Sequence, residues 1–242
     1  VSTHNLVSER LELATPVQVQ SETINDALDV QIAEGKICVL RRGGVVSCWG
    51  DDNFALDDMI AGQIGAFRAP EAVSFPEPIG PRPIVHSLAA GPNFAVVARG
   101  VNGGQAEVWR WQEGQPAQQV NQGGVQVLPH EAAIAVSGSG ATCAATDRGV
   151  WCSGRLIVGI DYQEGQLVQG IPVLAAQRVA CGYNHCCAYS SESGQAYCWG
   201  GNHRGQAGRE TAGGQNPLLR NPQHVRPGTP EGILNMALGR SH

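Results

Sequence analysis

The sequence has few charged and few aromatic residues, and it lacks any long hydrophobic run. Charged residues make up 15% of the 242 residues and aromatic residues 5%. No stretch reaches the roughly 18 consecutive apolar residues that mark a membrane-spanning helix, so no membrane insertion is expected. The net charge is −5 and no basic tail is present, which argues against nucleic acid but leaves a basic protein surface open as a partner. The sequence begins at Val1 with neither a methionine nor a signal-peptide pattern, so we expect a processed or trimmed product.

Glycine and proline, by contrast, are abundant. The 32 glycines and 14 prolines make 46 residues, close to one in five. Turn-rich, weakly charged chains with many short apolar runs are typical of all-β folds and not of helical ones. A length of 242 residues is enough for one sizeable core, so we expect a single domain over residues 1–242.

A repeated unit organises the chain, and its best-kept copy spans residues 180–208. In this copy Gly182 and His185 precede a short apolar run, a polar turn follows, and a second run ends at Trp199 and Gly200. Two short runs around a glycine-containing turn predict a β-hairpin. The five glycines that lead the copies are Gly35, Gly91, Gly138, Gly182 and Gly239. The first and last of them are 204 residues apart over four intervals, a mean period of 51, which is typical of an array or a propeller.

These residues resemble the RCC1-like repeat (regulator of chromosome condensation), whose pattern is roughly G-x-x-H-x-x-A-L, turn, G-x-V-x-x-W-G-x-N-x-x-G-Q-L-G. Residues 180–208 match nearly all of it, with Ala207 at the place of a leucine, and residues 239–242 match its opening up to His242. The other copies are degenerate, and the chain looks like a disulfide-containing, bacterial-type version of the family. The resemblance implies an all-β fold, a β-propeller with one four-stranded blade per repeat.

Five blade starts are visible, and the last of them lacks its hairpin. We therefore expect part of a larger propeller or an incomplete ring. Residues 1–15 are interpreted as the tail of an incomplete blade. The expected repeats lie near residues 16–69, 70–124, 125–168, 169–220 and, truncated, 221–242.

Six of the eight cysteines fall at equivalent places in three repeats, symmetrically about a predicted turn. The pairs are Cys38 and Cys48, Cys143 and Cys152, and Cys187 and Cys198. Directly opposed residues of antiparallel strands have Cα atoms about 4.5–5.5 Å apart, a spacing that permits a disulfide. The second repeat has Val96 and Arg110 at these places, so both cysteines are absent together. This pattern predicts at least three disulfides and an oxidising compartment.

The other two cysteines, Cys181 and Cys186, flank residues 182–185. They pair with each other or reach a neighbouring strand. A metal site is the alternative, since Cys181, His185, Cys186 and Cys187 are close in sequence. Their spacing is not a zinc-ribbon or zinc-finger pattern, so we expect neither a metal nor any other cofactor.

Tryptophan and aspartate supply the candidate binding residues. Trp49, Trp111 and Trp199 hold equivalent repeat positions and are expected to pack within or between blades. Trp109 and Trp151 lie on the opposite face and are candidates for binding. A further candidate is the acidic run 51–58, which lacks the pattern of a calcium loop and is more typical of a solvated loop. Its aspartates are Asp51, Asp52, Asp57 and Asp58.

No residues form a recognisable catalytic set. Residues 137–140 resemble a nucleophile elbow only superficially, because no helical pattern follows them. The glycines at 100–104 and 123–124 lack the lysine of a phosphate-binding loop. We therefore expect no enzymatic activity.

The pattern favours a secreted, periplasmic or cell-surface propeller that binds another protein or a surface polymer through its variable loops, within a larger complex. Two alternatives stay open: a nucleotide-exchange regulator of a small GTPase, which the family resemblance implies, and an enzyme built on a propeller scaffold. The repeated cysteine pairs and the absent basic tail count against the first. The lack of a clustered acid–base set counts against the second.

Overall fold

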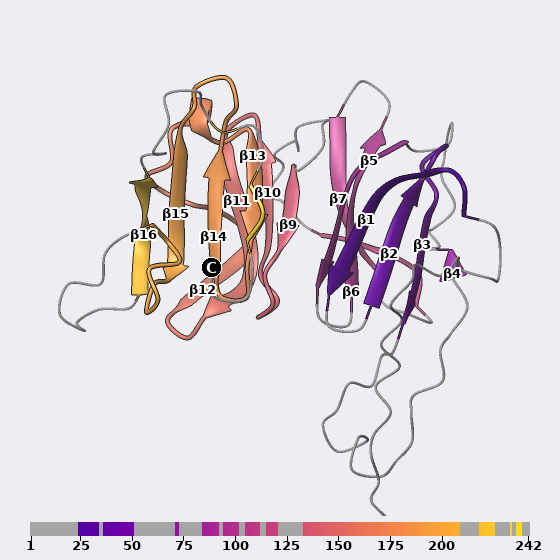
Figure 1. Cartoon of the computed structure of the whole chain (residues 1–242), viewed down its shortest axis with the longest axis horizontal. Helices are drawn as coiled ribbons and strands as arrows, with labels where there is room; N and C mark the ends of the chain where they lie inside the picture. The colour runs from indigo at the N-terminus through magenta and orange to yellow at the C-terminus, as the bar shows by residue number, and fades with distance from the viewer. Residues whose placement is uncertain are drawn as a thin grey trace, which may run out of the picture.

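In the computed structural model the chain folds into four antiparallel sheets of four strands each (Figure 1). We name these sheets blade 1 to blade 4 in chain order. The structure describes residues 24–33, 36–50, 71–72, 84–91, 94–101, 105–111, 115–120, 133–208, 218–225, 233 and 236–238. The helical structure within them is one short 3-10 turn, η1 (Val173–Ala175). None of the described helical residues form a segment with the length and hydropathy that crossing a membrane requires.

Each blade is a meander in which every strand pairs with the next one along the chain. Blade 1 contains β1 (Ala27–Ala33), β2 (Lys36–Arg41), β3 (Val46–Gly50) and β4 (Glu71–Ala72). Blade 2 contains β5 (Ile84–Gly91), β6 (Phe94–Val101), β7 (Gln105–Trp111) and β8 (Gln118–Gln119). Blade 3 contains β9 (Ile134–Val136), β10 (Thr142–Thr146), β11 (Gly149–Ile157) and β12 (Ile160–Leu167). Blade 4 contains β13 (Arg178–Cys181), β14 (His185–Tyr189), β15 (Ala196–Gly201) and β16 (Leu218–Val225).

Glycines at a hairpin turn explain how the two central strands of blade 1 come to pair. Gly43 and Gly44 have φ angles of 84° and 79°, a left-handed backbone that residues with a Cβ adopt only at a steric cost. The amide of Arg41 donates to the carbonyl of Val45 at 2.7 Å and closes the turn. The strands on either side are thereby set in register.

The central hairpin has the same register in all four blades. The opposed residues are Cys38 and Cys48, Val96 and Arg110, Cys143 and Cys152, and Cys187 and Cys198. The next residue along the second strand is Trp49, Trp111 or Trp199 in three of the blades, so these tryptophans hold one blade position. The predicted all-β fold with four-stranded blades is confirmed.

The blades stand side by side in chain order (Figure 1), and β1, β5, β9 and β13 contact one another in turn. Apolar clusters fill the boundaries between successive blades. At each boundary one blade contributes the side of its central hairpin that carries the cysteine pair, or Val96 and Arg110 in blade 2. We call this side the hairpin face. The next blade contributes its first strand. The described sheets do not close into a ring, in agreement with the expected larger or incomplete propeller. The repeat boundaries stay predictions, and residues 1–15 lie outside the described part of the chain.

Candidate binding face and disulfide cluster

All eight cysteines form disulfides, and each bond lies within one blade. Three bonds join opposed residues of the central hairpins, as the symmetric spacing predicts. They are Cys38–Cys48, Cys143–Cys152 and Cys187–Cys198. The fourth, Cys181–Cys186, joins β13 to β14 and decides between the two alternatives that the sequence leaves open. Disulfides in this number are typical of proteins in an oxidising compartment.

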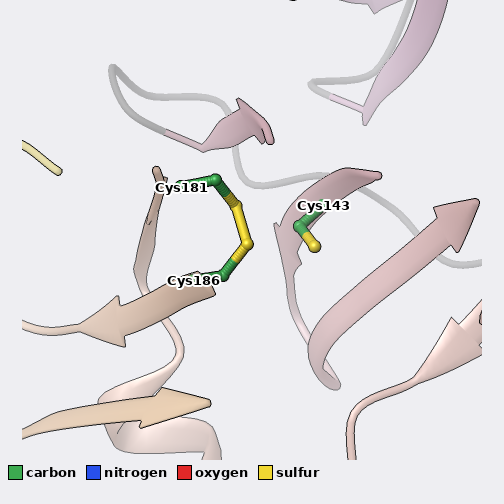
Figure 2. Close-up of side chains that lie close together, drawn as sticks. All are labelled: Cys143, Cys181 and Cys186. Carbon is green, nitrogen blue, oxygen red and sulfur yellow. A yellow bond between two sulfur atoms is a disulfide. The ribbon is translucent and has the colours of Figure 1, made fainter. Parts of the chain in front are cut away.

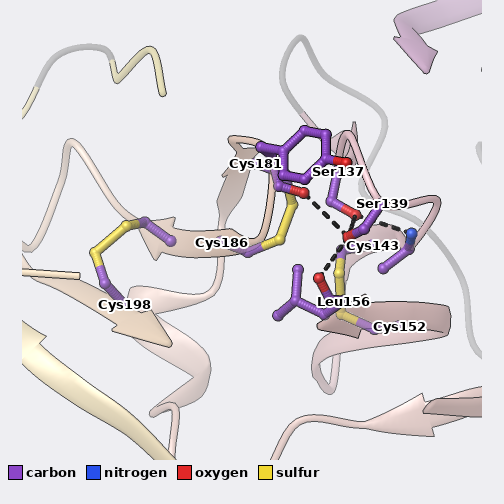
Figure 3. The surroundings of a disulfide bond; sticks show 11 residues. Ser137, Ser139, Cys143, Cys152, Leu156, Cys181, Cys186 and Cys198 are labelled. Carbon is purple, nitrogen blue, oxygen red and sulfur yellow. Dashed lines mark hydrogen bonds between the residues drawn. A yellow bond between two sulfur atoms is a disulfide. The ribbon is translucent and has the colours of Figure 1, made fainter. Parts of the chain in front are cut away.

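Two of the disulfides meet at the boundary between blades 3 and 4. Figure 2 shows the Cys181–Cys186 bond beside Cys143, and Figure 3 shows the Cys143–Cys152 bond as well. The Sγ atoms of Cys143, Cys181 and Cys186 lie within 4.8 Å of one another. Cys143, Cys152 and Cys186 are buried in one apolar cluster that also contains Trp199. The thiolate is the form of cysteine that binds zinc, and these sulfurs are held in disulfides. In this oxidised state the sulfur cluster is therefore part of the packed boundary between the blades.

The loop 182–185, which we call the lead loop, docks against blade 3 beside this cluster (Figure 3). The amide of Gly138 donates to the carbonyl of Gly182 at 3.1 Å, and the amide of Ser139 donates to the carbonyl of Tyr183 at 3.0 Å. The hydroxyl of Ser139 also lies 3.0 Å from the carbonyl oxygen of Tyr183. A Cβ at Gly138 would lie 2.4 Å from Cδ2 of Tyr183. Glycine at this lead position therefore permits the close approach of the two blades.

The histidine and the second glycine of the repeat are explained by the same loop. The amide of Gly182 donates to the carbonyl of His185 at 2.9 Å, which closes the loop tightly, and His185 is fully buried. Gly200 has a φ of 101°, and a Cβ there would lie 2.5 Å from the carbonyl oxygen of Asn184. These positions are therefore occupied for packing and backbone reasons.

The tryptophans divide into two groups, as their alternation along the strands indicates. Trp111 and Trp199 are fully buried. Trp109 packs against the boundary of blades 1 and 2, and its indole N–H donates to the carboxylate of Glu107 at 3.2 Å. Both Trp109 and Trp151 are half-buried. A binding role for these two residues stays a prediction.

Several of the predicted site residues lie outside the described part of the chain. They are Gly35, Asp51, Asp52, Asp57, Asp58, Gly239 and His242. Gly91 is described and ends β5, where it opposes Phe94.

Blade 1 has an apolar face that the sequence analysis does not single out. Leu28, Val30 and Ile32 alternate along β1 and are 60%, 50% and 73% exposed. Alternate residues of a strand point to the same side of the sheet, which places Val30 and Ile32 together, while Leu28 lies at a register shift in the pairing of β1 with β2. Ile32 opposes Ile37, which in turn opposes Trp49, so a row of apolar residues crosses three strands on this side. We call these five residues the open face. The period-two pattern of residues 28–32 is the signal that points to it.

Equivalent positions in the other blades are buried. In each blade, the residue that follows the first cysteine of the central hairpin (Val96 in blade 2) pairs with one residue of the first strand. These first-strand residues are Val30, Leu88, Ile134 and Val179. Val30 is 50% exposed, whereas the other three are 3%, 3% and 2% exposed. Trp49 is likewise only half-buried, although Trp111 and Trp199 at the same position are buried. A preceding blade covers this side of blades 2, 3 and 4, and no described blade covers it in blade 1. Val39 and Ser47, which lie beside Val30 on this side, are 3% and 5% exposed, so the exposed part of the side follows β1.

A model of the Regulator of chromosome condensation (RCC1) repeat matches residues 177–206, which cover all but the last two residues of the best-kept copy. No curated protein sequence matches the chain significantly.

Among solved structures, human WBSCR16 is similar with a TM-score of 0.62 and 16% identity, over 90% of this chain and 57% of that chain. Prp20p from Saccharomyces cerevisiae, described with its binding properties to Gsp1p and histones, gives a TM-score of 0.60 and 18% identity over 89% and 54%. Yeast RCC1 (Prp20) bound to Kap60 gives 0.57 and 17% over 89% and 52%. The chain thus spans just over half the length of these proteins, and at such identities the likeness shows the fold alone.

Proposed function

We propose that this chain, which carries an RCC1 repeat at residues 177–206 and has the fold of RCC1-type propellers, is a binding scaffold without chemistry of its own. It belongs to a larger assembly in an oxidising compartment, outside the cell, in the periplasm or on the cell surface. Its variable loops contact another protein or a surface polymer, because a rigid set of blades presents such loops along its edges.

The open face is the observation that carries this proposal. Single exposed apolar residues are normal on soluble proteins, but three exposed and two half-buried ones gathered on one sheet mark an interaction site. The buried equivalents of Val30 in three other blades identify the kind of interaction, because each of them packs against the hairpin face of the preceding blade. The occupant is therefore the hairpin face of a further blade of the same type.

Blade 4, at the other end of the described blades, also has its hairpin face packed against a later segment of the chain. The Cys187–Cys198 hairpin face of blade 4 is covered by Met236 and Leu238, which follow blade 4 in the chain. Each described hairpin face is thus packed against the segment that comes next. The open face of blade 1 is the matching half of such a boundary. The similar solved proteins are longer than this chain, and a further blade in a longer protein of this type would complete the boundary.

Charge substitution in the open face tests the proposal. In sedimentation and dye-binding experiments on residues 1–242, we expect binding of a hydrophobic dye and self-association through the open faces of two copies, because each described hairpin face is already packed. Val30→Asp should lower both several-fold, because the carboxylate would lose its hydration at the boundary. Val158→Asp is the matched control, since Val158 is 82% exposed and lies in a turn away from the open face.

A monomeric chain that binds no dye, and in which Val30→Asp behaves like Val158→Asp, would contradict the assembly part of the proposal. Turnover of a substrate by the purified chain would contradict the non-catalytic part. The GTPase-regulator alternative requires a reducing compartment, where small GTPases act and where four disulfides would not persist. A nucleotide-exchange assay with the oxidised chain separates the two.

A further inference from the structure

We infer that the Cys181–Cys186 and Cys143–Cys152 disulfides form a thiol-exchange couple that takes a low-molecular-weight thiol at Cys181 and produces a Cys143–Cys186 disulfide between blades 3 and 4. This goes beyond a binding role, because it gives the chain a reactive site with a defined class of co-reactant. The co-reactant is a small thiol such as glutathione, which is consumed once and is not turned over as an enzyme substrate.

The closeness of three sulfur atoms is the first support. The Sγ atoms of Cys143, Cys181 and Cys186 lie within 4.8 Å of one another, although they belong to two blades and two disulfides (Figure 2). Exchange requires a thiolate to reach a disulfide sulfur, and side-chain rotation closes a gap of this size. Both disulfides lie at the same packed boundary, where they are held next to each other.

Access is the second support. Seven of the eight cysteines are at most 4% exposed. Cys181 is the exception and is half-buried, at the rim of the boundary. A small thiol from solution therefore meets Cys181 first, and the leaving sulfur is that of Cys186, which is fully buried beside Cys143.

The exchange balances in three steps. The thiolate of the small thiol attacks Sγ of Cys181, forms a mixed disulfide there and releases the thiolate of Cys186. That thiolate attacks Sγ of Cys143, forms the Cys143–Cys186 bond and releases the thiolate of Cys152, which takes up a proton. A second small thiol then cleaves the mixed disulfide and leaves Cys181 as a thiol. In total, two small thiols are oxidised to their disulfide, and two protein disulfides become one disulfide and two thiols.

The Cys143–Cys186 disulfide connects different parts of the chain from the two disulfides that it replaces. Cys181–Cys186 closes the lead loop with a sequence separation of 5, and Cys143–Cys152 closes a hairpin with a separation of 9. The product bond joins residues 43 apart (186 − 143) and ties blade 3 to blade 4 covalently. It also releases the lead loop from its ring, and with it Tyr183, which is 38% exposed. The redox state of a small-thiol pool would thereby set the freedom of an exposed loop while the blades stay joined.

Removing one sulfur isolates the exchange step. In Cys152→Ser, Cys143 is a free thiol beside Cys181–Cys186. We expect it to attack Cys186 and to release Cys181, whose thiolate is the better solvated leaving group. Alkylation of the folded protein, followed by digestion and mass spectrometry, should find a Cys143–Cys186 linked peptide and the label on Cys181 in most molecules.

Cys48→Ser is the matched control. It frees Cys38, which holds in blade 1 the register position that Cys143 holds in blade 3. The residues of blade 2 that correspond to Cys181 and Cys186 are Ala90 and Ala95, so no disulfide faces Cys38. We expect the label in this variant on Cys38 alone, with the other three bonds intact.

An intact Cys181–Cys186 bond in Cys152→Ser, with the label on Cys143, would overturn the inference. So would equal scrambling of disulfides in Cys48→Ser, because it would show exchange without the sulfur cluster. The wild-type protein supplies a test that does not depend on the folding of a variant. At limiting glutathione it should accumulate the mixed disulfide at Cys181 and the Cys143–Cys186 bond, and direct reduction of both pairs without that bond would also overturn the inference.

Discussion

Two glycines of the repeat lie where two backbone segments approach each other. Gly138 lets blade 3 reach the lead loop, and Gly200 lets β15 pass the carbonyl of Asn184. The lead histidine, His185, has a different role, because its side chain is buried at the end of this tight loop. Sequence reasoning finds these residues as a pattern, but the neighbours that make them necessary lie in other segments and become visible only in the fold.

Two glycines with nearly the same φ angle allow the cost of a left-handed backbone to be measured separately from the cost of steric crowding at the Cβ. Gly140 has a φ of 100° and Gly200 a φ of 101°. A Cβ at Gly140 meets no described atom within 4 Å, whereas at Gly200 it would lie 2.5 Å from Asn184 O and 2.8 Å from the Cα of His185. Gly140→Ala should cost about 1–2 kcal/mol of unfolding free energy from the left-handed backbone, and Gly200→Ala about 1–3 kcal/mol more from overpacking. Urea unfolding of the oxidised proteins measures both, and equal losses would contradict the crowding argument.

Tyr162 gives a pH dependence at the residue scale. Burial at the boundary of blades 3 and 4 raises the pKa of Tyr162 from 10.0 to about 12. Between these values the folded state keeps the phenolic proton and the unfolded state loses it, so stability is fully present below pH 10 and falls as the pH rises towards about 12. Thermal unfolding between pH 9 and pH 11.5 should therefore show a steeper loss for the wild type than for Tyr162→Phe. Parallel curves would rule out a contribution of this residue.

At the scale of the strands, the central hairpins could be predicted and the strands around them could not. The hairpins carry their own signals, namely short apolar runs, a glycine turn and a cysteine pair placed symmetrically about it. β4 and β8 have two residues each, and so short a strand has no period to detect. The Cys181–Cys186 bond also stayed open, because its two cysteines are too close in sequence to mark a hairpin and their pairing depends on how β13 lies on β14.

The hairpin disulfides constrain elements that are otherwise built alike. Blade 2 has Val96 opposite Arg110 at the cysteine positions, so the hairpin register itself does not require a disulfide. Removing the Cys187–Cys198 bond, with a separation of 11 residues, should cost about 3 kcal/mol on the chain-entropy model. We therefore expect Cys187→Ala/Cys198→Ala to fold with unchanged circular dichroism but a lower urea midpoint. A lost β-sheet spectrum would instead show that the bond is needed for the hairpin to form.

At the scale of the whole molecule, the repeat period predicted the arrangement of the blades but not the state of their faces. Five lead glycines at a mean spacing of 51 residues imply a row of similar sheets, and the structure has them in chain order. Which face lies open depends on which described blade is not covered by another one, and a pattern that is the same in every repeat does not contain that information. The alternation of Leu28, Val30 and Ile32 reads like any half-buried strand until its equivalents are seen to be covered.

Because the open face of blade 1 is exposed and the same side of the later blades is covered, we expect the amides of the first strands to differ in protection from hydrogen exchange. β1, β5, β9 and β13 are each the first strand of a blade, and each pairs within its sheet with a single neighbour. What distinguishes them is the cover on their outer side, since a preceding blade packs on β5, β9 and β13. In hydrogen exchange of the oxidised chain, the amides of β1 should exchange at least tenfold faster than those of β9, which lies between two blades, because opening β1 exposes little additional apolar surface. Val30→Asp should leave this difference between β1 and β9 in place.

If β1 in residues 1–242 is instead protected like β9, and Val30→Asp removes that protection, the open face is already occupied by a second copy of the chain. If β1 is protected like β9 in both proteins, the open face is not the missing half of a blade boundary.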